Sequence, residues 1–233
     1  MTEWLGSYAT EAIWLSLKVA SVAVLASLPV GIAVAWLLAR HRFVGKALLD
    51  SVIHLPLVLP PVVIGYLLLV VMGQQGWLGR WLDEQLGLSF SFNWQGASLA
   101  AAVVGFPLMV RAIRLAFESV DPKLEAAART LGANRWRVFA TITLPLTLPG
   151  ILTGAVLAFA RSLGEFGATI TFVSNIPGET RTLPLAMYSF IETPGAEAQA
   201  AWLCAIAIVI ALASLLASEW LTRYTRARLG GQC

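Results

Sequence analysis

The chain has 233 residues, of which 58% are hydrophobic and only 12% are charged, and its formal net charge is +3. An ordinary soluble domain carries about 25% charged and about 45–50% apolar residues, so this composition excludes a typical soluble enzyme or binding module. A lipid bilayer is the solvent that accommodates so much apolar surface, and the chain is therefore predicted to be an all-α, polytopic membrane protein.

Five segments are apolar and long enough to cross a bilayer, which takes roughly 20 mostly apolar residues. A sixth apolar segment, residues 167–176, is too short to span and is expected to be re-entrant or interfacial. We assign residues 1–233 to one transmembrane domain, because no repeat or linker divides the sequence. The predicted spans are residues 12–39, 51–72, 96–118, 141–163 and 200–221.

Basic residues predict how the five spans are oriented, because Lys and Arg accumulate in cytoplasmic loops. Twelve of the 16 basic residues fall on one side of the five-span arrangement. This side is predicted to be cytoplasmic, with the N-terminus outside, the C-terminus inside and no need for a nucleic-acid partner. The twelve are Arg40, Arg42, Lys46, Arg111, Arg114, Lys123, Arg129, Arg135, Arg137, Arg223, Arg226 and Arg228.

Several kinds of site are missing from the sequence. Neither Cys204 nor Cys233 belongs to a disulfide or metal-binding pattern, so no metal site is predicted. No Gly-x-x-x-x-Gly-Lys-Ser/Thr phosphate loop occurs, so any ATP must bind to another chain. No chain of acids runs through the spans, as a proton relay requires. We therefore predict no catalytic residue.

A short helix is predicted in the cytoplasmic loop between the third and fourth spans, residues 121–140. Asp121 can cap its start, Pro122 suits its first turn, and Gly132 suits a left-handed stop. Glu125 and Arg129 are four residues apart, in the order that favours a surface ion pair. Such a helix can dock into a groove of another protein, or it can lie on its own bundle or on lipid headgroups; both interpretations stay open. Its small apolar face consists of Leu124, Ala127, Ala128 and Leu131.

The loop reads Glu125-Ala126-Ala127, then Gly132, then nine residues, then Ile142-Thr143-Leu144-Pro145. With this spacing it resembles the EAA loop of ABC importer permeases, which forms a coupling helix in a cleft of the ATP-binding subunit. One departure is that Glu125 lies seven residues before Gly132 rather than six, so Ala126 occupies the usual acidic position. The resemblance implies an ATPase-coupling role for Leu124, Glu125, Ala126, Ala127, Ala128, Arg129, Leu131 and Gly132.

Three prolines, Pro56, Pro60 and Pro61, fall within the second predicted span. Each removes a backbone donor and clashes one turn back, so the three cannot sit in an unbroken helix. In a membrane the freed carbonyls must be satisfied by protein or by a water-filled cavity. The segment is either a bent helix that lines a pathway, or a packing kink or a span that begins at Pro61. It resembles the proline-rich second core helix of molybdate permeases, which implies a pathway role.

An acid follows the fourth span, where it is costly unless it is paired or hydrated. Arg161 and Glu165 are one turn apart and can pair, which is also what an ordinary interfacial ion pair would do. Thr169 and Thr171 add hydroxyl donors of the kind that a tetrahedral oxyanion needs. The run Ser162-Leu163-Gly164-Glu165-Phe166-Gly167-Ala168 resembles a motif of molybdate and sulfate permeases that lies next to their gate. The implied pathway or gate residues are Pro56, Pro60, Pro61, Arg161, Glu165, Phe166, Gly167, Thr169, Thr171 and Ser174.

The three motifs occur in the family's order within residues 15–221, and the whole chain resembles molybdate ABC permeases of the type I importer fold. The resemblance implies a permease subunit that moves molybdate, and also tungstate, across the cytoplasmic membrane. It implies three kinds of partner besides lipid: two ATPase subunits that bind ATP and Mg, a periplasmic or extracellular molybdate-binding protein, and a second copy of the chain. The binding protein would dock on residues 175–182, which are otherwise a solvated loop.

Three alternatives remain at this level. Within the ABC class the chain could import sulfate or thiosulfate. Outside it, an anion carrier driven by an ion gradient is disfavoured by the missing relay acids. A purely structural assembly subunit leaves the proline-rich span unexplained.

Overall fold

The computed structural model describes the backbone of residues 2–230 and the side chains of residues 8–217, 219 and 220. Cys233 and the side chains of Arg223, Arg226 and Arg228 lie outside the described residues. The described elements are α1 (Thr2–Arg40), α2 (Lys46–Val58), α3 (Pro61–Met72), α4 (Trp77–Leu86), α5 (Trp94–Ser119), α6 (Pro122–Thr130), α7 (Arg135–Val138), a π-helical turn η1 (Phe139–Thr143), α8 (Leu144–Leu163), α9 (Gly167–Val173), α10 (Leu183–Ile191) and α11 (Glu197–Gly230).

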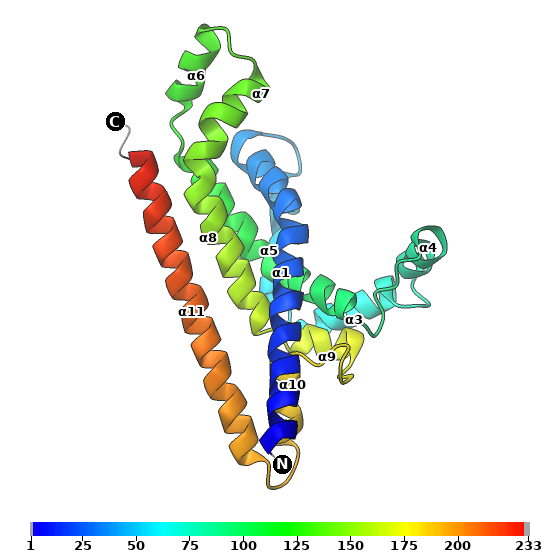
Figure 1. Cartoon of the computed structure of the whole chain (residues 1–233). Coiled ribbons are helices and arrows are strands. Elements are labelled where there is room, and N and C mark those ends of the chain that lie inside the picture. The colour runs from blue at the N-terminus through cyan, green and yellow to red at the C-terminus, as the bar shows by residue number, and fades with distance from the viewer. Residues whose placement is uncertain (1, 231–233) are drawn as a thin grey trace.

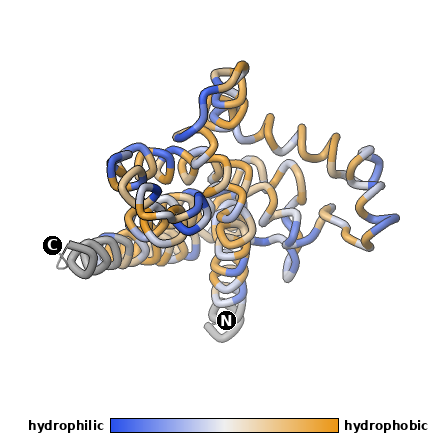
Figure 2. Tube along the Cα trace, turned by 90° about the horizontal axis from the view of Figure 1, so that it is seen from above, coloured by the Kyte–Doolittle hydropathy of each residue, from blue (hydrophilic) through white to orange (hydrophobic). Residues whose placement is uncertain are grey.

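Four helical stretches of the described chain are long and apolar enough to cross a membrane, and the bent pair α2–α3 makes a fifth when it counts as one span. The predicted all-α, polytopic fold with about five spans is therefore confirmed. Figure 2 shows hydrophobic colour along most of the helices, with hydrophilic stretches mainly at their ends and in the loops. The four stretches are Tyr8–Arg40, Trp94–Ser119, Arg135–Leu163 and Glu197–Ala217.

Helix α5 is the centre of the bundle and contacts α1, α2, α3, α8 and α9. Small residues make this crowding possible, because helices in lipid associate through close backbone approach. A Cβ added at Gly105 of α5 would stand 3.2 Å from the Ala158 carbonyl oxygen on α8, and one added at Gly154 of α8 would stand 2.9 Å from the Met109 carbonyl oxygen on α5. Helix α11 packs against α8 and α10 at the outside of this bundle (Figure 1).

The second predicted span is broken between α2 and α3, whose axes differ in direction by 115°. Leu59 and Pro60 each precede a proline, and both have extended ψ angles, 142° and 134°. A residue before proline is driven out of the helical region by the proline Cδ, which explains a break at this point. Pro56 is not part of the break, since it lies inside α2.

Two short helices, α4 and α10, were not predicted from the sequence. Helices α3 and α4 extend sideways from the bundle, whereas α10 packs against α1 and α11 (Figure 1). The N-terminus lies at one end of the molecule, and α6, α7 and the end of α11 lie at the other. The cytoplasmic location of the α6 end remains a prediction from the basic residues.

Candidate functional site

Helix α6 has the ends that its sequence predicts. The Asp121 carboxylate accepts a hydrogen bond from the Lys123 backbone N–H at 2.9 Å, and Pro122 occupies the first turn. Gly132 follows the helix with φ = +87°, in the left-handed region that glycine adopts without a steric cost. Local chemistry therefore sets both ends of α6.

Most of the surface of α6 is open to solvent in the single chain. Leu131 is 89% exposed and Leu124 is 49% exposed, and Ala126 and Ala127 are exposed as well. Only Glu125 and Ala128 are partly buried in this helix. An exposed apolar patch of this kind on a short capped helix is typical of a protein interaction site.

The Glu125 side chain pairs with Arg129, as the spacing predicts, but only at 3.9 Å, and its closer contacts are with residues outside α6. Its Oε1 lies 2.8 Å from Arg40 Nη2 at the end of α1, and it also accepts a hydrogen bond of 2.8 Å from the Thr143 hydroxyl. Arg129 approaches only to 3.9 Å and is 54% exposed. Arg40 and Thr143 interact with Glu125 more strongly than Arg129 does, because they are closer and better shielded from water.

The two segments with pathway motifs meet where α3 packs on α9. A Cβ added at Gly65 would stand 2.5 Å from the Ala168 carbonyl oxygen and 2.8 Å from the Thr171 Cβ. A Cβ added at Gly167 would stand 2.9 Å from the Pro61 Cβ. Pro61, Gly167 and Thr171 are therefore close neighbours, although more than 100 residues separate the two motifs.

Glu165 is 2% exposed and links the end of α8 to the start of α9. One carboxylate oxygen lies 2.8 Å from Arg161 Nη1, and the other accepts a hydrogen bond of 2.8 Å from the Ala168 backbone N–H. The carboxylate thus caps α9, where an acid is also favoured by the helix dipole. The predicted Arg161–Glu165 pair is present and is buried on the acid's side.

The remaining predicted pathway residues differ in their burial and in the helices that they contact. Thr169 is buried, and the Thr171 hydroxyl donates to the Gly167 carbonyl at 2.8 Å, so this donor is already in use. Ser174 is exposed and ends α9 with φ = +64°. Pro56 lies within α2, whose main contacts are with α5 rather than α9.

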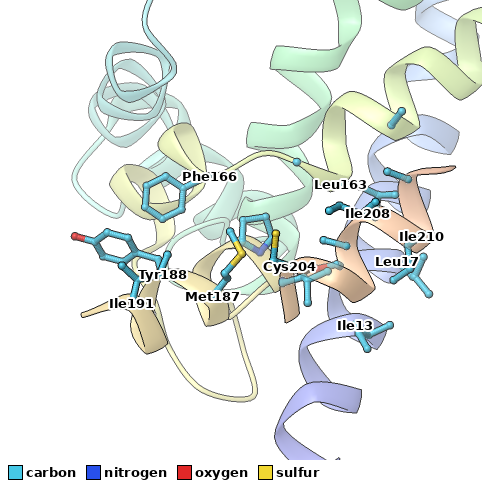
Figure 3. A pocket seen from close by; sticks show the side chains of 17 residues that line it. Ile13, Leu17, Leu163, Phe166, Met187, Tyr188, Ile191, Cys204, Ile208 and Ile210 are labelled. Atoms are coloured by element: carbon cyan, nitrogen blue, oxygen red, sulfur yellow. Dashed lines mark hydrogen bonds between the residues drawn. The ribbon is translucent and has the colours of Figure 1, made fainter. Parts of the chain in front are cut away.

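A cavity of about 510 Å³ lies between α1, α8, α10 and α11, and Figure 3 shows the side chains that line it. Phe166 and Tyr188 lie at one side of it, with their ring centroids 5.0 Å apart, and Met187 and Cys204 lie near its middle. Its lining is almost entirely apolar. A cavity with so few donors suits hydrocarbon rather than an oxyanion, and the pathway role of Phe166 remains a prediction.

A compact polar loop at the opposite end from α6 joins α9 to α10. Thr180 is fully buried; its hydroxyl accepts from the Ile176 N–H at 2.8 Å and donates to the Ser174 carbonyl at 3.0 Å. Arg181 donates to the Asn175 side chain at 2.9 Å and to the Tyr8 hydroxyl at 2.6 Å. Sequence reasoning missed the Tyr8 contact, because 173 residues separate the two partners.

The Tyr188 hydroxyl, which lies outside the predicted spans, has a raised pKa. The Glu192 carboxylate accepts a hydrogen bond from the Tyr188 hydroxyl at 2.5 Å and raises its pKa above the usual 10.0. The tyrosine is therefore neutral at physiological pH.

Comparison with known proteins places this geometry in a family. Residues 27–230 match the family of binding-protein-dependent transport system inner membrane components. The chain belongs to this family. The permease is 71% identical over 220 residues to the "Molybdenum transport system permease protein ModB" of Escherichia coli K12, covering 94% of this chain and 96% of that protein.

Two further comparisons bear on substrate and fold. The permease is 39% identical to the "Probable sulfate transport system permease protein cysT" of Chlorokybus atmophyticus, over 70% of this chain and 56% of that one. A solved structure of the MetNI methionine ABC transporter in an inward-facing conformation has a chain that matches with a TM-score of 0.73 and 16% identity. This match covers 97% of the permease and 99% of that chain, so the whole chain has the fold of an ABC importer permease.

Proposed function

We propose that this permease is the membrane subunit of an ATP-driven importer that moves molybdate, and also tungstate, across the cytoplasmic membrane. The observation that carries the proposal is the 71% identity over nearly the full length of a molybdenum transport permease. The identity to the sulfate transport protein is 39% over a smaller share of both chains. Sulfate or thiosulfate import is accordingly the second candidate.

Helix α6 couples ATP binding in the ATPase subunits to movement of the spans. Two ATPase subunits with their bound ATP and Mg face the two α6 helices of a permease dimer. Leu124, Ala127, Leu131 and Gly132 provide the exposed contact surface, and Ala126 stands where related loops carry an acid. ATP binding closes the ATPase dimer and displaces α6, and the spans then rock between inward-open and outward-open states.

A second copy of the chain completes the pathway. Helix α3 projects from the bundle (Figure 1) and exposes apolar residues, including Val62 at 54% and Tyr66 at 59%. Two ATPase subunits require two coupling helices, and this chain has one, so a homodimer with the pathway on its two-fold axis satisfies the count. The joined α3–α9 segment then lies close to the substrate route.

The periplasmic or extracellular binding protein delivers the anion to the opposite end of the molecule from α6. The loop of Asn175, Thr180 and Arg181 is held by internal hydrogen bonds and offers a preformed surface for it. Arg161 is already paired with Glu165, and Thr171 with Gly167. A pathway with few free donors binds the dianion weakly, which favours release, so the binding protein carries most of the selectivity.

The test of ATP drive uses proteoliposomes that contain the permease, its ATPase and its binding protein. Uptake of labelled molybdate should require ATP on the ATPase side and should stop when the ATPase is omitted. Uptake that proceeds equally well without ATP would place the chain among carriers driven by ion gradients.

A further inference from the structure

One carboxylate oxygen is the point at which three elements meet at the α6 end of the molecule. Glu125 Oε1 on α6 accepts from Arg40 Nη2 on α1 and from the Thr143 hydroxyl in η1, both at 2.8 Å. The Arg40 and Glu125 side chains are 18% and 14% exposed. Water is therefore largely excluded from this ion pair, which makes it stronger than a pair on the open surface. We call Arg40, Glu125 and Thr143 the clasp.

Little else holds α6 to the bundle. Its main contacts among the described residues are with α7 and η1, which follow it in the chain, and most of its side chains are exposed. Figure 1 shows α6 standing beyond the ends of the long helices, joined to them by connecting segments. The clasp is thus a specific attachment of α6 to α1, made between residues 85 positions apart.

The receiving side of the clasp is a packed aromatic group. The Phe139 ring of η1 lies 6.0 Å from the Trp36 ring of α1 and 6.3 Å from the Phe117 ring of α5, measured between centroids. Phe117 and Thr143 are almost completely buried. A π-helical turn at this junction is also a feature that helices often show at functional positions. A force on Glu125 would therefore act on a rigid junction of α1, α5 and the start of α8.

We propose that Arg40 is a positioning residue for energy coupling: through Glu125 and Thr143 it fastens the coupling helix to α1 and to the start of α8. Displacement of α6 then moves those spans directly. Without the clasp, α6 still binds the ATPase through its exposed face, but its movement is absorbed in the segments around Asp121 and Gly132. This inference rests on the proposed function and assigns its mechanical link.

The experiment compares Arg40→Gln with the unaltered permease in the complete reconstituted complex. The readouts are ATPase co-purification, ATP hydrolysis and the amount of molybdate taken up per ATP hydrolysed. We expect co-purification and hydrolysis to persist, while uptake per ATP falls about tenfold, the equilibrium change that corresponds to loss of one charge-assisted hydrogen bond. Arg40→Lys should restore much of the ratio, because it keeps the charge.

Arg42→Gln is the matched control, since Arg42 is an exposed basic residue two positions away, and it should leave the ratio unchanged. Thr143→Val removes one hydrogen bond of the clasp and keeps both charges, so it decides the matter if Arg40→Gln does not assemble; we expect a smaller fall in the ratio. An unchanged ratio in Arg40→Gln, or in Thr143→Val where it must decide, overturns the inference. A complex with unaltered permease that shows no ATP-dependent uptake refutes the proposed function instead.

Discussion

Gly65 of α3 lies so close to Ala168 of α9 that a Cβ at Gly65 would stand 2.5 Å from the Ala168 carbonyl oxygen. The neighbouring atom is backbone, so a flexible side chain cannot make room. Two motifs that are distant in the sequence are therefore joined by direct contact of their backbones. The broken second span and the short α9 behave as one packed unit.

Gly65→Ala should separate this unit. The added methyl group overpacks the α3–α9 contact at a cost of about 1–3 kcal/mol, and α3 must shift. We expect a lower midpoint of thermal unfolding in detergent and a large loss of transport. Gly164→Ala is the control, because a Cβ at Gly164 would meet nothing within 4 Å beyond its own chain neighbours and local helix backbone. Equal thermal midpoints for the two variants would show that the close contact is not a constraint.

Glu165 offers a test that separates its two roles. Glu165→Gln keeps an acceptor for the Ala168 N–H but loses the charge that faces Arg161, whereas Glu165→Ala loses both. A buried group left without its partner costs about 1–3 kcal/mol, and more when it is charged, so the alanine variant should be the less stable. Thermal unfolding of the purified permease measures the order, and the reverse order would contradict the capping role.

The exposed Leu131 side chain should affect binding of the ATPase but not the stability of the permease. Leu131→Ser removes an apolar side chain that is 89% exposed, so it should leave the permease stable but reduce co-purification of the ATPase several-fold, as truncation of a buried interface anchor does. Leu86→Ser on α4 removes another exposed leucine, away from α6, and should have no such effect. Full ATPase recovery with Leu131→Ser would argue against α6 as the docking element.

Local chemistry explains which features could be predicted from the sequence. Asp121, Pro122 and Gly132 determine the ends of α6 through interactions with their own neighbours, and Pro60 and Pro61 determine where the second span breaks. The Arg161–Glu165 pair was predictable for the same reason, since its members are one helical turn apart. Features that depend on a few consecutive residues are readable without the fold.

Long-range geometry accounts for what was missed. The spacing of Glu125 favoured a pair with Arg129, but the folded chain brings Arg40 closer to Glu125. No local sequence pattern predicts a partner 85 residues away. The 115° turn between α2 and α3 places α3 against α9, a contact that the proline pattern does not encode. Helix α4 was detectable in principle, since Gly76 and Gly87 flank it, although its ten residues are too short for a span.

Thr180 should hold the loop that faces the binding protein. Thr180→Val removes a fully buried hydroxyl and leaves the part-buried Ile176 N–H and Ser174 carbonyl without this partner, at a cost of about 1 kcal/mol. We expect the binding protein to bind the reconstituted complex more weakly. The affinity is measured by titrating the binding protein against the immobilised complex. Thr193→Val serves as the control, because the Thr193 hydroxyl donates to the Ser189 backbone carbonyl at an exposed site. Identical affinities for both variants would exclude a preformed docking loop.

The central claim, that the complex imports molybdate, is tested most directly by competition during ATP-driven uptake. Labelled molybdate is taken up by proteoliposomes with the permease, its ATPase and its binding protein, in the presence of excess tungstate or excess sulfate. The account predicts that tungstate blocks uptake and that sulfate does not. Loss of molybdate uptake to sulfate would contradict it and would make the complex a sulfate importer.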